Sequence, residues 1–261
     1  MNRQMLMALL TGFMAAEGGL TRAASDTDLL RPVRTIPLPG VQGRIDHLAV
    51  DVAGQRLFVA ALGNNTVEVI DLQKGQRVRS VGGFKGARLA DVALDAHPES
   101  FQLDTASDRI FVNLVSLPKI AVVDARRSAV AATWPVSAGS AKFPMALDAS
   151  HHRLFVLTRK PPRLAVFDTD TGREVATLDA DGDADDLFYD AARQRLYACF
   201  GAGSVIVYAQ IDPDRYRELA KVTTADGART GLFSAELRRL FVAVPRRAHP
   251  VAEIRVFETG R

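Results

Sequence analysis

Residues 145–168 read MALDASHHRLFVLTRKPPRLAVFD, and this stretch decides the fold. An apolar strand ends at Asp148, a polar turn follows, and a second strand begins at Arg153. A third strand with alternating apolar residues then closes at Asp168. Short runs of β-branched and aromatic residues with a period of two, separated by polar turns, predict consecutive β-hairpins rather than helices.

The second strand of this stretch recurs along the chain as a four-residue core. The five copies are Arg56-Leu57-Phe58-Val59, Arg109-Ile110-Phe111-Val112, Arg153-Leu154-Phe155-Val156, Arg195-Leu196-Tyr197-Ala198 and Arg239-Leu240-Phe241-Val242. Their arginines are spaced by 53, 44, 42 and 44 residues. In the third copy a fourth strand follows, marked by Gly172, Val175 and Leu178. Four short strands repeated at this period predict an all-β fold, a β-propeller of four-stranded blades with five recognisable repeats.

The two ends of the chain complement each other. The fifth copy stops at Arg261 without a fourth strand, whereas Val33 and Ile36 have the same spacing as Val175 and Leu178. We therefore expect the strand near residues 33–38 to pair with the strand near residues 254–257 and to complete the last blade. Such pairing removes an exposed sheet edge. We also expect no long helix after residue 30.

The junction at residues 75–95 is irregular, because the first arginine spacing is about ten residues longer than the others. It holds two outer-strand patterns, one beginning at Gly75 and one at Gly86, without three inner strands between them. We expect residues 76–81 and 88–94 to form separate strands. The interpretation that we favour is an incomplete six- or seven-bladed ring, and the alternative is a decorated loop.

The N-terminus differs in character from the rest of the chain. Arg3 precedes an apolar run from Met5 to Ala16, and small residues follow near Ala24. This order is typical of a signal peptide, so we assign residues 1–24 to one and residues 30–258 to a single β-propeller domain. The run is too short to span a bilayer, and we expect a periplasmic or secreted protein without a membrane span in the mature chain. Cys199 is the one cysteine, and its apolar strand position predicts a buried thiol.

The repeated cores and the Asp-x-x-x-Gly-x-x-Val outer turns, such as Asp71 with Gly75 and Asp168 with Gly172, resemble the YVTN-repeat, YncE-like propellers. The resemblance covers essentially residues 30–258. It implies seven blades, export in bacteria and ligand binding rather than a common enzymatic activity. DNA binding occurs within that family, so the resemblance also makes DNA a candidate partner. This chain departs from the seven-blade pattern at residues 82–87.

Candidate site residues come from the connections that enter the innermost strand of each blade, because these connections converge near the propeller axis. They lie in residues 43–47, 96–100, 141–144, 182–186 and 227–230. The ionisable residues that we select there are Arg44, Asp46, His47, His97, Glu99, Lys142, Asp185 and Arg229. We expect them to gather on one face around the axis and to form a polar mouth for a small ligand or a partner.

Two other roles for these residues stay open. Arg44, Lys142 and Arg229 could pair with Asp46, Glu99 and Asp185 in an ion network that fixes the connections. His47, His97, Glu99 and Asp185 carry the donor atoms that divalent metals accept, although their spacing says nothing about geometry. We expect no resident metal and no cofactor. Outside the connections, Arg159, Lys160 and Arg163 surround two prolines, and we expect a solvated basic hairpin tip there.

Composition and motifs favour binding over catalysis. The chain has a net charge of +3 and 7% aromatic residues, which does not predict the basic, aromatic groove of a single-stranded nucleic-acid binder. A Gly-x-Ser-x-Gly elbow and a Gly-rich phosphate loop are absent from the sequence. We therefore expect an exported binding protein. The alternatives are a lactonase-like hydrolase that uses Asp46, His47, Glu99 and Asp185, and single-stranded nucleic-acid binding.

Overall fold

The computed structural model describes residues 29–82, 92–246 and 250–260, so the proposed signal peptide lies outside it. The described chain folds into five four-stranded antiparallel sheets, which confirms the predicted all-β propeller of blades. Within these ranges the one helical element is a 3-10 turn, η1 (Leu62–Asn64). The same ranges hold no helix long and apolar enough to cross a membrane.

Each sheet takes its strands in chain order, and one sheet also recruits the N-terminal strand. The first sheet comprises β2 (Ile45–Asp51), β3 (Arg56–Ala61), β4 (Thr66–Asp71) and β5 (Gln76–Gly82). The second comprises β6 (Pro98–Asp104), β7 (Arg109–Leu114), β8 (Lys119–Asp124) and β9 (Ala129–Pro135). The third comprises β10 (Ser140–Asp148), β11 (Arg153–Lys160), β12 (Pro162–Asp168) and β13 (Glu174–Asp179). The fourth comprises β14 (Ala184–Asp190), β15 (Arg195–Phe200), β16 (Ser204–Asp212) and β17 (Arg215–Thr223). The fifth comprises β18 (Thr230–Ser234), β19 (Arg239–Val244), β20 (Ala252–Thr259) and β1 (Leu30–Leu38).

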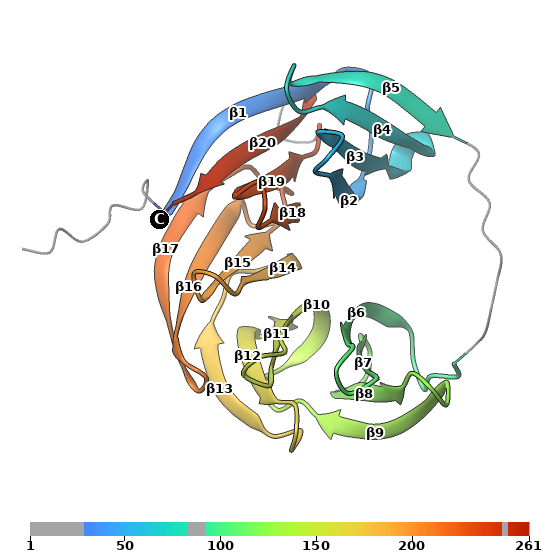
Figure 1. The fold of residues 1–261 in the computed structure, drawn as a ribbon, viewed down its shortest axis with the longest axis vertical. Coiled ribbons are helices and arrows are strands. Elements are labelled where there is room, and N and C mark those ends of the chain that lie inside the picture. The colour runs from blue at the N-terminus through green and yellow to red at the C-terminus, as the bar shows by residue number, and fades with distance from the viewer. Residues whose placement is uncertain (1–28, 83–91, 247–249, 261) are drawn as a thin grey trace, which may run out of the picture.

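The sheets stand around a common axis in an open arc, with β2–β5 at one end and β6–β9 at the other (Figure 1). The innermost strands contact one another in the series β6, β10, β14, β18 and β2. Strand β1 pairs antiparallel with β20, and Ile36 lies opposite Ile254. This pairing confirms the predicted completion of the last blade by the N-terminal strand.

A shared turn explains why the first hairpin of each blade forms. Asp51 Oδ1 accepts the amide N–H of Gly54 at 2.8 Å, and Asp148 Oδ1 accepts that of His151 at 3.3 Å. An aspartate that bonds its own turn in this way favours a tight reversal. The residue before each motif arginine has a positive φ, as in Gln55 (51°) and His152 (56°). Successive blades therefore reverse with the same backbone geometry.

The hydrophobic core lies between neighbouring sheets and follows the repeated motif. The aromatic residue of one motif packs in the same cluster as the leucine of the next: Phe155 with Leu196, and Tyr197 with Leu240. Successive residues of a strand point to opposite faces of the sheet. The leucine of a motif therefore packs against the preceding blade, and the aromatic residue packs against the following blade. The motif thus specifies both faces of each blade.

The irregular junction agrees with the prediction in part. Residues 76–81 lie in β5, as expected. Residues 88–91 fall outside the described residues, and Val92 to Leu94 are not in a strand, contrary to the prediction. Val92 and Leu94 instead pack on the β6–β9 sheet beside Ile110. The apolar spacing there reflects packing against a sheet face rather than strand pairing.

Candidate functional site

A cavity of about 250 Å³ lies at the axis, and every innermost strand contributes to its wall. Because each of these strands occupies the same place in its blade, their first residues converge there. The lining residues are Arg44, Asp46, His47, Leu48, Glu99, Ser100, Phe101, Phe143, Asp185, Asp186, Phe188, Gly231 and Leu232. Charged groups and aromatic rings therefore share one cavity, which is more polar than most small-molecule sites.

Most of the residues selected from the sequence meet at this cavity. Its lining includes Arg44, Asp46, His47, Glu99 and Asp185. Arg229 lies beside it, with Nε 3.3 Å from the carboxylate of Asp185. Arg229 also lines an adjoining cavity of about 60 Å³, to which Arg44 contributes as well. The convergence expected from the repeat is thus present for these six residues.

Two selected residues lie elsewhere. His97 is exposed, with Nδ1 3.9 Å from Glu99, and it is not part of the cavity lining. Lys142 is fully buried in β10, and its Nζ donates to the backbone oxygen of Leu117. Burial lowers the pKa of this lysine. Lys142 therefore fastens the third sheet to the second and does not pair with Glu99.

Strand β14 supplies the acidic side of the cavity, and a β-bulge shapes it. The pairing with β15 shifts between Ala184 and Asp186, so Asp185 is an extra residue on the bulged strand. Similar shifts occur near the start of β2, β6 and β10. Bulges redirect side chains next to functional sites. This bulge allows the adjacent residues Asp185 and Asp186 both to line the cavity.

Two arginines from neighbouring blades hold Asp185 and the nearby Asp183. Arg159 Nη2 donates to Asp185 at 2.7 Å, and its Nη1 lies 3.1 Å from Asp183. Arg229 Nη1 donates to Asp183 at 2.7 Å. Paired guanidinium groups with several donors fix carboxylates more rigidly than single amines do. The four side chains form a mixed-charge cluster that joins β11, β14 and the connection before β18.

Arg159 corrects the expectation of a solvated basic tip. Its side chain is only 17% exposed, and its guanidinium carbon lies 3.5 Å from the centroid of the Phe143 ring. Its Nε also donates to the backbone oxygen of Ala184 at 2.8 Å. The arginine therefore points toward the axis, where a cation–π contact and ion pairs stabilise it. Its place at the end of a long strand beside two prolines concealed this role.

Asp186 is the residue with the most altered acidity at the site. Burial raises its pKa, the nearby charges of Asp185 and Asp46 add to this rise, and the hydrogen bond from Gly231 opposes it, so that the pKa is about 8. The amide N–H of Gly231 donates to Asp186 Oδ2 at 2.7 Å. Burial also raises the pKa of Asp185, although Arg229 and Arg159 oppose it. A neutral carboxyl can donate a proton or a hydrogen bond where a carboxylate can only accept.

The opposite wall, on β2, is more exposed. Arg44 Nη2 donates to Asp46 Oδ1 at 2.9 Å, and His47 Nδ1 lies 3.5 Å from the same oxygen. The His47 side chain is 90% exposed, so it contributes little fixed structure. The ion-network interpretation therefore holds for two pairs, Arg44 with Asp46 and Arg229 with Asp185.

The metal interpretation finds no support in the described residues. They contain no group of three or more histidine, cysteine or acidic side chains arranged to hold an ion. Cys199 is fully buried, as predicted, and burial raises the pKa of its thiol. A buried neutral thiol is a poor ligand and a poor nucleophile. The ionisable residues that line the axial cavity are Arg44, Asp46, His47, Glu99, Asp185 and Asp186.

Comparisons with known proteins support the fold. A chain in the crystal structure of a mitotic checkpoint complex is similar to this chain, with a TM-score of 0.62 and 12% sequence identity. The match covers 99% of each chain. No family model matches the sequence, and no curated protein matches it. At this identity the likeness concerns the arrangement of blades alone.

Proposed function

We propose that this protein is an exported binding protein that holds a small polar ligand in the axial cavity. The observation that carries the proposal is the pair Asp185 and Asp186 in a cavity that all five innermost strands line, with Asp185 held by Arg159 and Arg229. Such a site presents fixed hydrogen-bond donors and acceptors in a place partly shielded from water. The aromatic rings supply an apolar wall.

The charges favour a ligand that carries both acceptors and donors. The arginines are already matched by aspartates, so a strongly charged ligand gains little net attraction. The neutral carboxyl of Asp186 instead offers a donor, and the rings of Phe101 and Phe143 offer apolar contact. We therefore propose a zwitterionic or polyhydroxylated small molecule, with free amino acids and hexoses as probes.

The test is calorimetric titration of the mature protein with these probes. We expect Asp185→Asn and Arg229→Gln to weaken binding about tenfold or more, because each removes a charged hydrogen-bonding group. The matched control is Arg217→Gln, which changes an exposed arginine on the outer strand β17. Failure of both probe classes to bind, or equal affinity in all three variants, would contradict the proposal.

The sequence features that support export are the apolar run and the small residues within residues 1–24. We propose that the chain is a YVTN-repeat, YncE-like propeller of the bacterial periplasm or exterior, supported by its repeated cores. Cell fractionation followed by N-terminal sequencing tests this. A mature protein that begins near residue 25 supports export, and a cytoplasmic protein that retains Met1 contradicts it.

One observation favours a second candidate, a lactonase-like hydrolase. A carboxyl with a pKa of about 8 beside other acids is a suitable general acid or base near neutral pH. The ionised fraction of Asp186 would take a proton from the water that attacks the lactone carbonyl and return it to the ring oxygen as the acyl C–O bond breaks, which gives the hydroxy acid. Turnover of γ-butyrolactone that is lost in Asp186→Asn and kept in Arg217→Gln would establish this function in place of simple binding.

A further inference from the structure

The arginine that opens each repeated core usually bridges to the next blade. Arg153 Nε donates to the backbone oxygen of Pro213 at 3.0 Å, just after the third strand of the fourth sheet. Arg109 Nη1 reaches the oxygen of Thr169 at 2.5 Å in the same way, and Arg195 Nη1 reaches that of Gly260 at 3.3 Å. Three neighbouring pairs of sheets are therefore joined by one repeated contact.

The interface between the fifth and first sheets differs. Here Arg34 of β1 donates to the carbonyl groups that follow β4, the third strand of the first sheet. Its Nη1 lies 3.0 Å from Leu72 O and 3.2 Å from Gln73 O. The motif arginine, Arg239, pairs instead with Glu258 of its own sheet at 3.3 Å. The N-terminal strand thus replaces the motif arginine in the bridge and leaves Arg239 at the edge of the interface.

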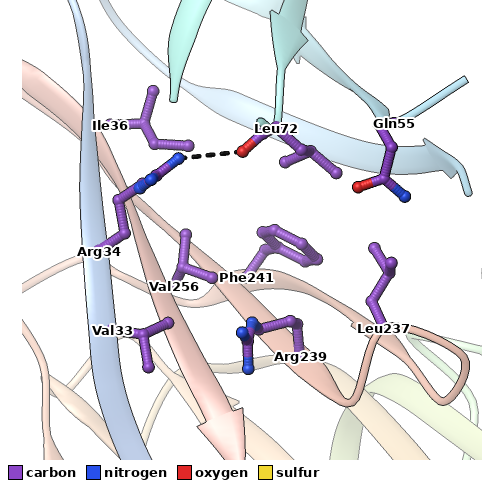
Figure 2. Close-up of a pocket in the computed structure, with 9 residues that line it drawn as sticks. All are labelled: Val33, Arg34, Ile36, Gln55, Leu72, Leu237, Arg239, Phe241 and Val256. Carbon is purple, nitrogen blue, oxygen red and sulfur yellow. Dashed lines mark hydrogen bonds between the residues drawn. The ribbon is translucent and has the colours of Figure 1, made fainter. Parts of the chain in front are cut away.

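A cavity of about 290 Å³ lies at this interface (Figure 2). The residues that line it are Val33, Arg34, Ile36, Gln55, Leu72, Leu237, Arg239, Phe241 and Val256. Its size is just below the usual range for small-molecule sites, about 300–1,000 Å³. In Figure 2 the ring of Phe241 and the side chain of Val256 lie between the two arginines.

The lining combines an apolar floor with positive charge. Phe241, Ile36 and Val256 are buried members of one core cluster. The lining residues include two arginines and no carboxylate, and Glu258 faces Arg239 from outside this set. Each guanidinium carries five N–H donors, and the contacts above engage Nη1 of Arg34 and Nη1 of Arg239.

We propose that this inter-blade cavity binds a small amphipathic monocarboxylate. The carboxylate accepts from Arg239, Arg34 adds positive charge from the other side of the apolar floor, and the apolar body covers Phe241 and Val256. Guanidinium groups match the two oxygens of a carboxylate in geometry and charge. An apolar body of a few carbons gains contact area with the buried floor. The site is separate from the axial cavity, because the two share no lining residue.

The experiment titrates the whole mature protein with hexanoate, with hexan-1-ol of the same length and with acetate. We expect hexanoate to bind at least about tenfold more tightly than either other probe, because it alone combines charge and apolar length. Arg239→Gln should lower hexanoate affinity about tenfold and leave the alcohol unchanged. Val33→Trp should block both by filling the cavity, since Val33 lines it and is partly exposed.

Two controls separate this site from its surroundings. Arg238→Gln changes the neighbouring arginine. Arg238 has a positive φ, and glutamine already adopts this conformation at the equivalent positions Gln55 and Gln194, so the substitution should be tolerated. Arg229→Gln changes the axial cavity instead. Neither should affect hexanoate binding. Equal affinity for hexanoate and hexan-1-ol, equal loss in Arg239→Gln and Arg238→Gln, or no hexanoate binding up to about 10 mM would overturn the proposal.

Discussion

The interior sheets and the two end sheets of the arc carry the same motif in different surroundings. In the third sheet Phe155 is fully buried against the fourth sheet, whereas Phe58 of the first sheet is half-buried. At the other end, Phe101 of β6 is 65% exposed and Leu103 is 51% exposed. The motif therefore specifies the blade, and the neighbouring blade determines how much of it is buried.

This difference predicts the largest effect. Phe155→Ala should destabilise the protein by about 3–5 kcal/mol, because it opens a cavity in a packed core. Phe58→Ala should cost about 1–2 kcal/mol, because the ring is already partly in water. Urea unfolding of both variants measures the two losses. Equal losses would show that Phe58 is packed by a neighbour like the other motif aromatics.

The motif arginines extend the comparison. The Arg153 side chain is 11% exposed and pairs with Asp168 and Asp214 at 2.8 Å each, whereas Arg56 of the first sheet is exposed. Arg153→Gln should cost about 1–3 kcal/mol, because it leaves the partly buried carboxylate of Asp168 and the backbone oxygen of Pro213 without their donor. Arg56→Gln should stay within about 0.5 kcal/mol of the unchanged protein. A comparable loss in both would mean that the bridge between blades contributes little to stability.

The sequence predicted the repeated unit well, and it did so for a physical reason. Alternating apolar residues and turn-forming aspartates act locally, so strands and hairpins follow from a few neighbouring residues. The pairing of Ile36 with Ile254 was also predictable, because an incomplete last blade requires a fourth strand. The favoured incomplete ring also agrees with the open arc of five sheets, whereas the contacts between blades could not be predicted, because no short segment encodes them.

The site was predicted in outline. Asp185 and Arg229 were found from their place in the repeat, and they do lie together. Arg159 was missed because it comes from the far end of a neighbouring second strand, and Asp186 because a bulge alters which side chains line the axis. Lys142 was selected wrongly. It has the expected position in the repeat, but its side chain is buried between sheets and does not reach the axial cavity.

A further prediction concerns pH. Because the pKa of Asp186 rises from 3.8 to about 8 on folding, the folded state holds its proton more tightly between these values. Its contribution to stability is full below pH 4 and is lost as pH rises through 8. Relative to Asp186→Asn, the unchanged protein should lose about 4 kcal/mol between pH 5 and 8, at about 1.4 kcal/mol per pH unit.

The matched control for this pH effect is Asp181→Asn. Burial raises the pKa of Asp181, but hydrogen bonds from Lys221 and Ser204 outweigh this effect and hold the pKa below its usual value. That carboxylate is therefore ionised throughout the range from pH 5 to 9. The difference in the free energy of unfolding between Asp181→Asn and the unchanged protein should therefore stay constant from pH 5 to 9. If the corresponding difference for Asp186→Asn is also independent of pH, Asp186 is ionised at neutral pH.

The most direct test of the axial site is the titration of the Asp186 carboxyl itself, followed by carbon NMR with Asp186→Asn to assign the signal. This carboxyl is shielded from water among other acids, where the Gly231 amide and the arginines do not restore its ordinary acidity. We expect a midpoint near pH 8. A midpoint below about pH 5, as in a solvated aspartate, would contradict the neutral donor on which the proposed polar site depends.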